Sequence, residues 1–339
     1  MVKIGVIGAG VIGLSSALRV LERFPNADVT VIAAQFSPDT TTNVSGGFWE
    51  PHLLGETPES DIRVWSGKTF EHMQGLADSE HARATGATMV SGYRMTEAEE
   101  PVPFWKDLVL NFREMTEDEL KPYHPMTKGS FFTTVMLDPA LYLQWLKTRF
   151  QERGGRLLQR RLSSLHELLS DAYDVIINCT GTGARELLGD DKVQAVRGQV
   201  MRVYAPWLKM HISFEFADGT EGYVLPGMNY VVLGGTRQVG DWDTRVRAVD
   251  RDHIWGICTK YMPSLKSAEV QSDHVGLRPS RTSVRLELER VAMGGKHVPV
   301  IHNYGHGGGG VTLHWGCADH VVSLVSQVIP ANSRSQAKL

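Results

Sequence analysis

The first 35 residues contain three apolar segments that predict a strand, a helix and a second strand. Lys3–Ile7 is short and apolar, and Val11–Phe24 places apolar residues at helical spacing. Asp28–Ala33 is rich in β-branched residues and predicts a parallel strand. The turn after the first strand reads Gly8-Ala9-Gly10-Val11-Ile12-Gly13. This arrangement is a βαβ unit with the glycine pattern of a dinucleotide-binding fold.

The remaining pattern is that of an α/β protein. Residues 35–51 are rich in Thr, Ser and Gly and predict a long loop. Helices are expected over Leu141–Phe150 and His320–Val328, and Thr116–Glu119 has the sequence of a capping box. A glycine-rich loop is expected from Gly305 to Gly310. The expected strands are Asp174–Cys179, Gln199–Tyr204, Tyr223–Leu225, Tyr230–Gly234 and Val298–His302.

This order of elements predicts two domains. A Rossmann-like nucleotide-binding domain is assembled from residues 1–50, 135–182 and 296–330. Residues 51–134 and 183–295 form a second domain with a mainly antiparallel sheet, because alternating strands follow Gly198. Residues 331–339 are expected to be a flexible tail.

Composition narrows the class of protein. Thirty-five basic and 38 acidic residues leave a net charge of −3, without the basic stripe of a nucleic-acid binder. No segment reaches the roughly 18 apolar residues of a membrane helix, so we expect a soluble globular protein. Three scattered cysteines predict neither a disulfide framework nor a zinc site, and indicate a reducing compartment.

The carboxyl-terminal tripeptide resembles a targeting signal. Ala337-Lys338-Leu339 differs by one residue from the Ser-Lys-Leu peroxisomal address. We therefore expect import into the peroxisomal matrix by the receptor that reads this address. The alternative is a polar tail that no receptor reads, which would leave the protein in the cytoplasm.

The glycine pattern indicates how a nucleotide would bind. Gly8 permits the tight turn, Gly10 lets the backbone approach a pyrophosphate, and Gly13 allows close packing of helix and strand. The alternative is an ordinary tight turn. The acidic residue expected at the end of the second strand is missing, since Ala34 and Gln35 stand there. Gln35 could hydrogen-bond a ribose, and no arginine nearby supports a 2′-phosphate.

A second glycine site lies near the end of the chain. Gly307, Gly308, Gly309 and Gly310 are consecutive and cost conformational entropy, so close passage of backbone against a flat ligand is expected there. A flexible linker is the alternative. The segment Asn178-Cys179-Thr180-Gly181 could bring a strand end to the same ligand.

Taken together, these motifs resemble the D-amino-acid oxidase family along nearly the whole chain. The resemblance rests on the ordered segments Gly8–Gly13, Thr40–Val44, Asn178–Gly181, Arg197–Gln199, Ala205–Trp207, Gly276–Pro279 and His302–Gly308. It implies tightly but noncovalently bound FAD, oxygen as electron acceptor, hydrogen peroxide as product and a peroxisomal location. Members of the family usually have an Asp at the position of Ala34.

The resemblance also implies which residues contact FAD. They are Gly8, Gly10, Val11, Ile12, Gly13, Gln35, Thr40, Thr41, Gly47, Phe48, Leu162, Gly181, Gly307, Gly308, Gly310 and Thr312.

For the substrate, the resemblance implies that Arg278 binds the α-carboxylate with help from the Tyr223 hydroxyl. Taken alone, Arg278 could equally form a structural salt bridge. The implied reaction is hydride transfer from Cα of a D-amino acid to flavin N5, followed by release of a 2-oxo acid and ammonia. No side-chain base is obligatory, because orientation is the main task of the protein. His302 and His306 are expected beside the cofactor or in structural roles, with no metal.

Substrate choice depends on Arg237, which resembles an arginine that faces the side-chain carboxylate in D-aspartate oxidases. A surface arginine paired with Asp241 or Asp243 is the alternative. Two departures from that pattern are Phe216 in place of another arginine and Gly308 in place of serine. The lid tyrosine of oxidases that act on neutral D-amino acids is missing as well, with Gly219 in the corresponding short loop. We expect oxidation of D-aspartate and D-glutamate, with neutral D-amino acids as the alternative. An NAD-dependent dehydrogenase and a non-catalytic nucleotide-binding protein remain as other classes.

Overall fold

The computed structural model describes residues 1–98 and 100–329, so the tripeptide Ala337-Lys338-Leu339 lies outside the described residues. The α-helices are α1 Val11–Arg23, α2 Thr41–Val44, α3 Glu59–Ala77, α4 Ala82–Thr85, α5 Glu117–Leu120, α6 Pro139–Glu152, α7 Ala184–Leu188, α8 Ala248–Tyr261 and α9 Gly310–Val328. Short 3₁₀ helices occupy Lys121–Tyr123, Leu165–Leu168, Gly181–Gly183 and Pro263–Ser267.

The strands of the described residues join in one sheet of 14 strands. They are β1 Lys3–Ile7, β2 Asp28–Ala33, β3 Thr88–Thr96, β4 Leu110–Glu114, β5 Lys128–Met136, β6 Arg156–Gln159, β7 Val175–Asn178, β8 Gln194–Tyr204, β9 Met210–Glu215, β10 Glu221–Pro226, β11 Val231–Gly234, β12 Gln238–Val239, β13 Glu269–Met293 and β14 Lys296–His306. The order is β4-β5-β3-β9-β10-β11-β8-β13-β14-β7-β1-β2-β6, and β12 pairs with β8.

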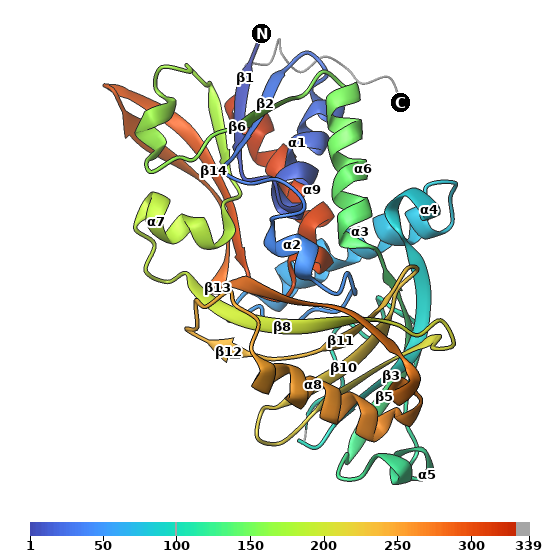
Figure 1. The fold of residues 1–339 in the computed structure, drawn as a ribbon. Coiled ribbons are helices and arrows are strands. Elements are labelled where there is room, and N and C mark those ends of the chain that lie inside the picture. The colour runs from blue at the N-terminus through green and yellow to red at the C-terminus, as the bar shows by residue number, and fades with distance from the viewer. Residues whose placement is uncertain (99, 330–339) are drawn as a thin grey trace.

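One half of the sheet is parallel and carries the predicted βαβ unit. Strands β14, β7, β1, β2 and β6 pair in parallel. Their apolar side chains pack with α1, α9, α6 and α3, which gather in the upper part of Figure 1. The amino-terminal βαβ unit is therefore confirmed, and its strands are buried as parallel strands usually are.

The other half is mainly antiparallel, as expected for the part of the chain after Gly198. Strands β8, β9, β10 and β11 form antiparallel pairs, while β3 and β9 run parallel. Helix α8 covers β8, β10 and β11 in the lower part of Figure 1. The long strand β13 joins the halves, because its first part pairs with β8 and its second part with β14.

Several element boundaries differ from the predicted ones. The last helix begins at Gly310, ten residues before the predicted start at His320. Glycine is unfavourable inside a helix, so Gly316 argued against a helix at this point of the sequence. In the structure Gly316 lies inside α9, because a Cβ there would come within 2.3 Å of the Trp65 carbonyl oxygen and only glycine fits. The expected loop over residues 35–51 contains the single helical turn α2. Helix α6 starts at Pro139, where the Asp138 side chain accepts from the amides of two residues in the first turn. The capping box at Thr116 is confirmed.

A buried arginine ties the loop before α8 to β8. The side chain of Arg197 is fully buried and forms a 2.6 Å ion pair with Asp250 of α8. Its other donors reach the side chains of Gln199 and Gln238 and the backbone carbonyl oxygens of Asp243 and Arg245. All parts of the guanidinium are therefore satisfied, which a buried charge requires.

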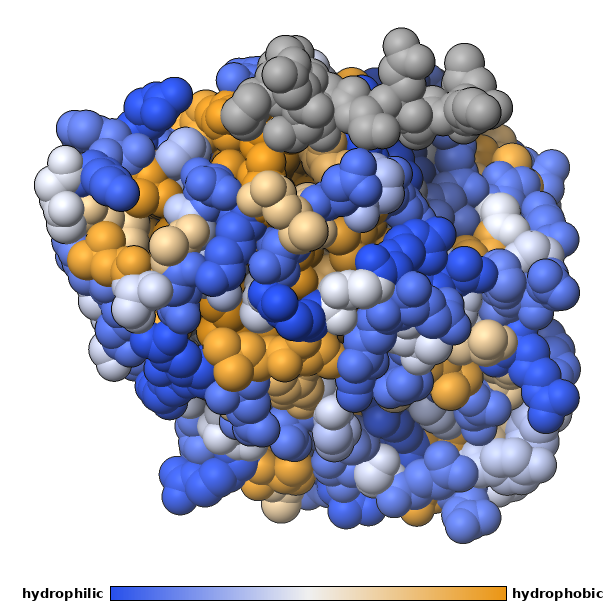
Figure 2. Space-filling model, turned by 90° about the horizontal axis from the view of Figure 1, so that it is seen from above, coloured by the Kyte–Doolittle hydropathy of each residue, from blue (hydrophilic) through white to orange (hydrophobic). Residues whose placement is uncertain are grey.

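The surface of the protein carries both hydrophilic and hydrophobic residues (Figure 2). Seen from the end that carries the amino terminus, hydrophilic residues surround smaller hydrophobic patches (Figure 2). Among the described residues, no helix has the length and apolar character needed to cross a membrane. The three cysteines are buried and unpaired.

We expect Asp250→Ala to lower the free energy of unfolding by about 3–5 kcal/mol, because it leaves the Arg197 charge buried without its carboxylate partner. Chemical denaturation followed by circular dichroism measures the change. The matched control is Asp252→Ala, an exposed aspartate of the same helix, which should shift the value by at most about 0.5 kcal/mol. Equal effects of the two substitutions would contradict a stabilising role of the buried pair.

Candidate functional site

A cavity of about 980 Å³ is lined by residues of both halves of the sheet. Its nucleotide-binding side includes Gly8 and Gly10, and its other side includes Tyr223 and Arg278. This volume lies at the upper end of the range for ligand pockets. The described residues thus place the predicted cofactor and substrate residues around one space.

The turn between β1 and α1 is built by close backbone packing. Gly8 has a φ of +110°, and a Cβ there would lie 2.3 Å from the Cys179 carbonyl oxygen. A Cβ on Gly13 would lie 2.0 Å from the carbonyl oxygen of Gly8. The predicted packing role of Gly13 is therefore confirmed, and the amino end of α1 is left facing the cavity, where backbone N–H groups favour phosphate.

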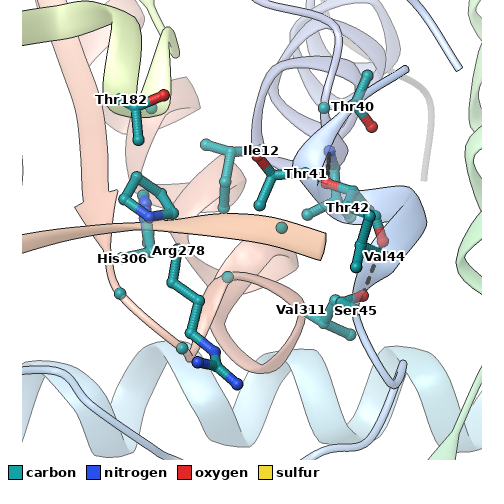
Figure 3. Close-up of a pocket in the computed structure, with 18 of the residues that line it drawn as sticks. Ile12, Thr40, Thr41, Thr42, Val44, Ser45, Thr182, Arg278, His306 and Val311 are labelled. Atoms are coloured by element: carbon teal, nitrogen blue, oxygen red, sulfur yellow. Dashed lines mark hydrogen bonds between the residues drawn. The ribbon is translucent and has the colours of Figure 1, made fainter. Parts of the chain in front are cut away.

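A threonine cluster lies beside this helix end. The Val11 amide donates to Thr42 Oγ1 at 3.1 Å, and Thr40 and Thr41 also line the cavity. Figure 3 shows Thr41 and Thr42 of α2, with Thr41 close to Ile12, and Thr40 just before this helix. The threonine-rich segment is thus part of the site.

The end of β2 lacks a carboxylate, as the sequence predicts, but an acidic residue is near. Ala34, Gln35 and Asp39 all line the cavity. The Asp39 amide donates to the Phe36 carbonyl oxygen at 2.9 Å, which curls this loop back toward the site. Sequence reasoning missed Asp39 because it stands five residues after Ala34, beyond the position where the fingerprint places its acid.

The late glycine run packs against protein backbone. A Cβ on Gly307 would lie 1.9 Å from the Leu53 carbonyl oxygen, and one on Gly308 would lie 2.8 Å from His52 Cδ2. These two glycines are therefore packed against residues 52 and 53, and they also line the cavity, so their close approach to a flat ligand stays a prediction. Gly310 has no atom within 4 Å of such a Cβ and opens onto the cavity.

Arg278 reaches the cavity from β13. A Cβ on Gly198, which faces it from β8, would lie 2.6 Å from Arg278 Nη1, so only glycine leaves room for this side chain. Nη1 donates to the Thr236 carbonyl oxygen at 2.8 Å. In Figure 3, Arg278 extends from its strand on the side away from Thr182 and Ile12. Its nearest carboxylate is Glu221, 3.8 Å from Nη2.

Tyr223 belongs to β10, and its side chain lies beside that of Arg278. Its ring lies over Gly234 and Gly235, where a Cβ would come within 2.1 Å and 2.7 Å of ring atoms. Burial raises the pKa of Tyr223 to about 12, so the hydroxyl keeps its proton and can donate a hydrogen bond. Tyr223 and Arg278 therefore lie together at the cavity, and their joint binding of a substrate carboxylate stays a prediction.

The substrate side of the cavity also holds charged residues that sequence reasoning missed. Arg94 pairs with Glu50 at 3.1 Å and with Glu215 at 3.3 Å, and all three line the cavity. Glu221 lines it as well. Burial raises the pKa of Glu50 and of Glu221, and nearby arginines oppose both shifts. These residues come from four separate segments, so no motif in the sequence connects them.

Arg237 lies next to these charged residues. It does not line the cavity, although its positive charge acts on both His52 and Glu221. Its Nη2 donates to the Gly219 carbonyl oxygen at 3.0 Å, and Nη1 is 3.6 Å from Glu215. The alternative pairing with Asp241 or Asp243 is wrong, because Arg247 binds both of those carboxylates.

Most of the predicted contact residues line the cavity. They are Gly8, Gly10, Val11, Ile12, Gln35, Thr40, Thr41, Gly47, Phe48, Leu162, Gly181, Tyr223, Arg278, Gly307, Gly308 and Gly310. Gly13, Arg237 and Thr312 do not. The Thr312 hydroxyl instead donates to the Glu50 carbonyl oxygen at 2.8 Å.

The two histidines have different surroundings. His306 is buried beside the cavity, and burial lowers its pKa to about 3. His302 contacts Glu289 at 3.0 Å and Asn178 at 3.3 Å. Within residues 1–98 and 100–329, no three His, Cys, Asp or Glu side chains group as a metal site requires.

Comparison with known proteins agrees with this geometry. The sequence model of the DAO family, described as FAD dependent oxidoreductase, matches residues 3–324. The chain is 42% identical to a human D-aspartate oxidase over 332 residues, covering 97% of this chain and 96% of that protein. It is 36% identical to a D-amino-acid oxidase of Rubrobacter xylanophilus, with 96% of each chain covered.

Solved structures show the same fold. A glycine oxidase from Geobacillus kaustophilus superposes with a TM-score of 0.76 at 17% identity, covering 98% of this chain and 96% of that one. A glycine oxidase from Bacillus cereus gives a TM-score of 0.72 at 15% identity, with 97% and 96% covered. The cavity, its glycine-lined nucleotide side and the match over nearly the whole chain agree, and the chain belongs to the DAO family of FAD-dependent oxidoreductases.

Proposed function

We propose that this enzyme oxidises D-amino acids to 2-oxo acids, ammonia and hydrogen peroxide, with D-aspartate and D-glutamate as preferred substrates and oxygen as electron acceptor. The observation that carries the proposal is the placement of Arg278 beside Tyr223 in the cavity, where no carboxylate of the described residues is within hydrogen-bond distance of its guanidinium. A guanidinium in this state can bind a substrate carboxylate through two parallel hydrogen bonds.

The residues present fit FAD, the cofactor of the family. A pyrophosphate would lie at the amino end of α1, beside Gly10 and the threonines of α2. We propose that Asp39 takes the place of the usual carboxylate near the ribose. When bound, FAD supplies the acceptor for the hydride that leaves the substrate Cα.

The protein's own part in the reaction is to orient the substrate. Arg278 and the Tyr223 hydroxyl would hold the α-carboxylate from neighbouring strands. Because both side chains are packed against glycines, their positions are constrained before the substrate arrives. No residue is needed to remove the hydrogen of Cα as a proton, since it leaves as a hydride.

The preference for acidic substrates is supported by Arg237 and by the name of the human relative. Arg237 is 3.6 Å from Glu215, just beyond hydrogen-bond distance, so a substrate carboxylate could exchange for this partner. A neutral substrate would gain nothing from that arginine.

A second candidate is the oxidation of neutral D-amino acids. It is favoured by the position of Arg237 outside the cavity wall and by the carboxylates of Glu50, Glu215 and Glu221 on that wall. These negative charges would repel an acidic side chain unless Arg94 or Arg237 turned toward it.

Peroxide release from purified enzyme with added FAD separates these candidates. We would compare D-aspartate, D-alanine and both L-enantiomers side by side. Strong turnover of D-aspartate with little of D-alanine supports the acidic preference, and the reverse supports the second candidate. Absence of peroxide with every D-amino acid would reject the proposed function.

Arg278→Ala should lower kcat/KM for every D-amino acid by roughly 10²–10⁴-fold, because the α-carboxylate loses its charged partner. The flavin absorbance spectrum should stay unchanged. Arg290→Ala, an exposed arginine on the same strand, is the matched control and should keep full activity. Loss of bound flavin in Arg278→Ala would instead assign this arginine a structural role.

Arg237→Ala should lower kcat/KM for D-aspartate by about 10–100-fold and leave D-alanine nearly unaffected, because only the side-chain carboxylate loses a charged hydrogen bond. Steady-state kinetics with both substrates measures the split. Arg245→Ala, an exposed arginine in the next loop, serves as the control. Equal losses for the two substrates would remove Arg237 from substrate selection.

Asp39→Ala should raise the dissociation constant of FAD by about tenfold, because one charged hydrogen bond to the cofactor is lost. Titration of apoprotein with FAD, followed by quenching of flavin fluorescence, gives the constant. The exposed Asp252→Ala on α8 is the control. An unchanged constant would show that Asp39 does not hold the cofactor.

A further inference from the structure

Glu221 is a buried carboxylate with an unsatisfied oxygen. Its side chain is 9% exposed, and Oε1 is buried without a hydrogen-bond partner. Leaving a charged acceptor unpaired in this way costs free energy. Because the residue also lines the cavity, the missing donor can come from a ligand.

The position of Glu221 limits what this ligand can be. Oε1 lies 3.8 Å from Arg278 Nη2, and Oε2 lies 3.7 Å from His52 Nε2. Burial and the nearby arginines lower the pKa of His52 to about 3, so this imidazole is neutral at pH 7 and supplies no charge. The other charged or titratable groups that act with Glu221 are Arg237, Glu215, Glu50 and Tyr223.

We propose that Glu221 binds the α-ammonium group of the substrate and accepts its proton. The inference rests on the proposed function, in which Arg278 binds the α-carboxylate. In every amino acid the ammonium nitrogen is separated from the carboxylate carbon by a single carbon atom. The carboxylate of Glu221 lies directly beside Arg278 and therefore matches the zwitterion. Arg278 would bind the carboxylate end of the substrate and Glu221 its ammonium end.

The proton transfer balances without any co-reactant. One N–H bond of the ammonium breaks, an O–H bond forms on Glu221, and the electron pair stays on nitrogen. The products are a neutral α-amine and a neutral carboxylic acid. A neutral amine is the form that can release a hydride from Cα, because its lone pair stabilises the positive charge that develops there.

The environment favours the carboxylate as a proton acceptor. Burial raises the pKa of Glu221, and Arg278 and Arg237 oppose this shift. When a substrate carboxylate binds Arg278, its negative charge offsets the positive charge of that arginine, which strengthens the basicity of Glu221 further. Binding and proton transfer are thus coupled in the favourable direction.

Anaerobic stopped-flow reduction of the holoenzyme tests this assignment. In Glu221→Gln, productive binding requires substrate that has already lost its ammonium proton in solution. The second-order rate constant of flavin reduction by D-aspartate and D-alanine should therefore fall by about 10²–10⁴-fold at pH 7. It should then rise tenfold per pH unit until the pKa of the substrate amine, and approach the wild-type value above it.

Two further variants keep the test independent of folding. Glu221→Asp retains a carboxylate and should restore most of the rate at pH 7. Glu287→Gln, an exposed glutamate on β13, is the control and should match the wild type. Benzoate, a carboxylate without an ammonium, should bind Glu221→Gln as well as or more tightly than the wild type, as measured by the flavin spectrum.

Three outcomes would overturn the inference. The same pH dependence in the wild type and Glu221→Gln would show that Glu221 does not take the proton. Weaker binding of both benzoate and substrate would make its role structural. Failure of every D-amino acid to reduce the wild-type flavin would reject the proposed function itself, which the first two outcomes leave intact.

Discussion

The pairing between β8 and β13 is the constraint on which both halves of the molecule depend. Leu277 pairs with Arg197, and Arg278 with Val196, so the two arginines point to opposite faces of the sheet. Arg197 is buried against Asp250 and the loop before α8, while Arg278 enters the cavity over Gly198. A shift of one residue would place both arginines on the same face of the sheet, so one of them would lose its present surroundings. The register therefore decides which arginine meets the substrate.

The substrate side of the cavity is unusual because its charges nearly balance. Arg94 and Arg278 line it together with Glu50, Glu215 and Glu221, and Arg237 pairs with Glu215 from outside the lining. Glu50 and Glu221 are desolvated by burial, and each lies near an arginine that a ligand carboxylate could also bind. The carboxylates of the substrate and those of the protein's own glutamates therefore compete for the same arginine side chains. Substrate selection does not depend on one arginine paired with one substrate charge.

Part of the fold was predictable because its signals are local, whereas α3, β3, α8 and β13 were not predicted. The βαβ unit, the capping box and the antiparallel character after Gly198 follow from periodicity and turn chemistry over short windows. The predicted boundary of α9 was wrong because a tertiary contact overrides the local preference of the sequence. Gly316 lies within α9 because the backbone of Trp65 packs against it, and no pattern near Gly316 indicates that partner.

The sequence by itself determined the nucleotide-binding turn, because this turn depends on residues that are adjacent in the chain, whereas Arg278 was identified only through the resemblance to a family. Only the tertiary structure decided which acidic groups face that arginine. Glu50 and Glu221 belong to separate segments, and their pKa values depend on burial and on arginines from other strands. Electrostatic energy depends on spatial separation and local polarity, and neither quantity can be read from spacing along the chain.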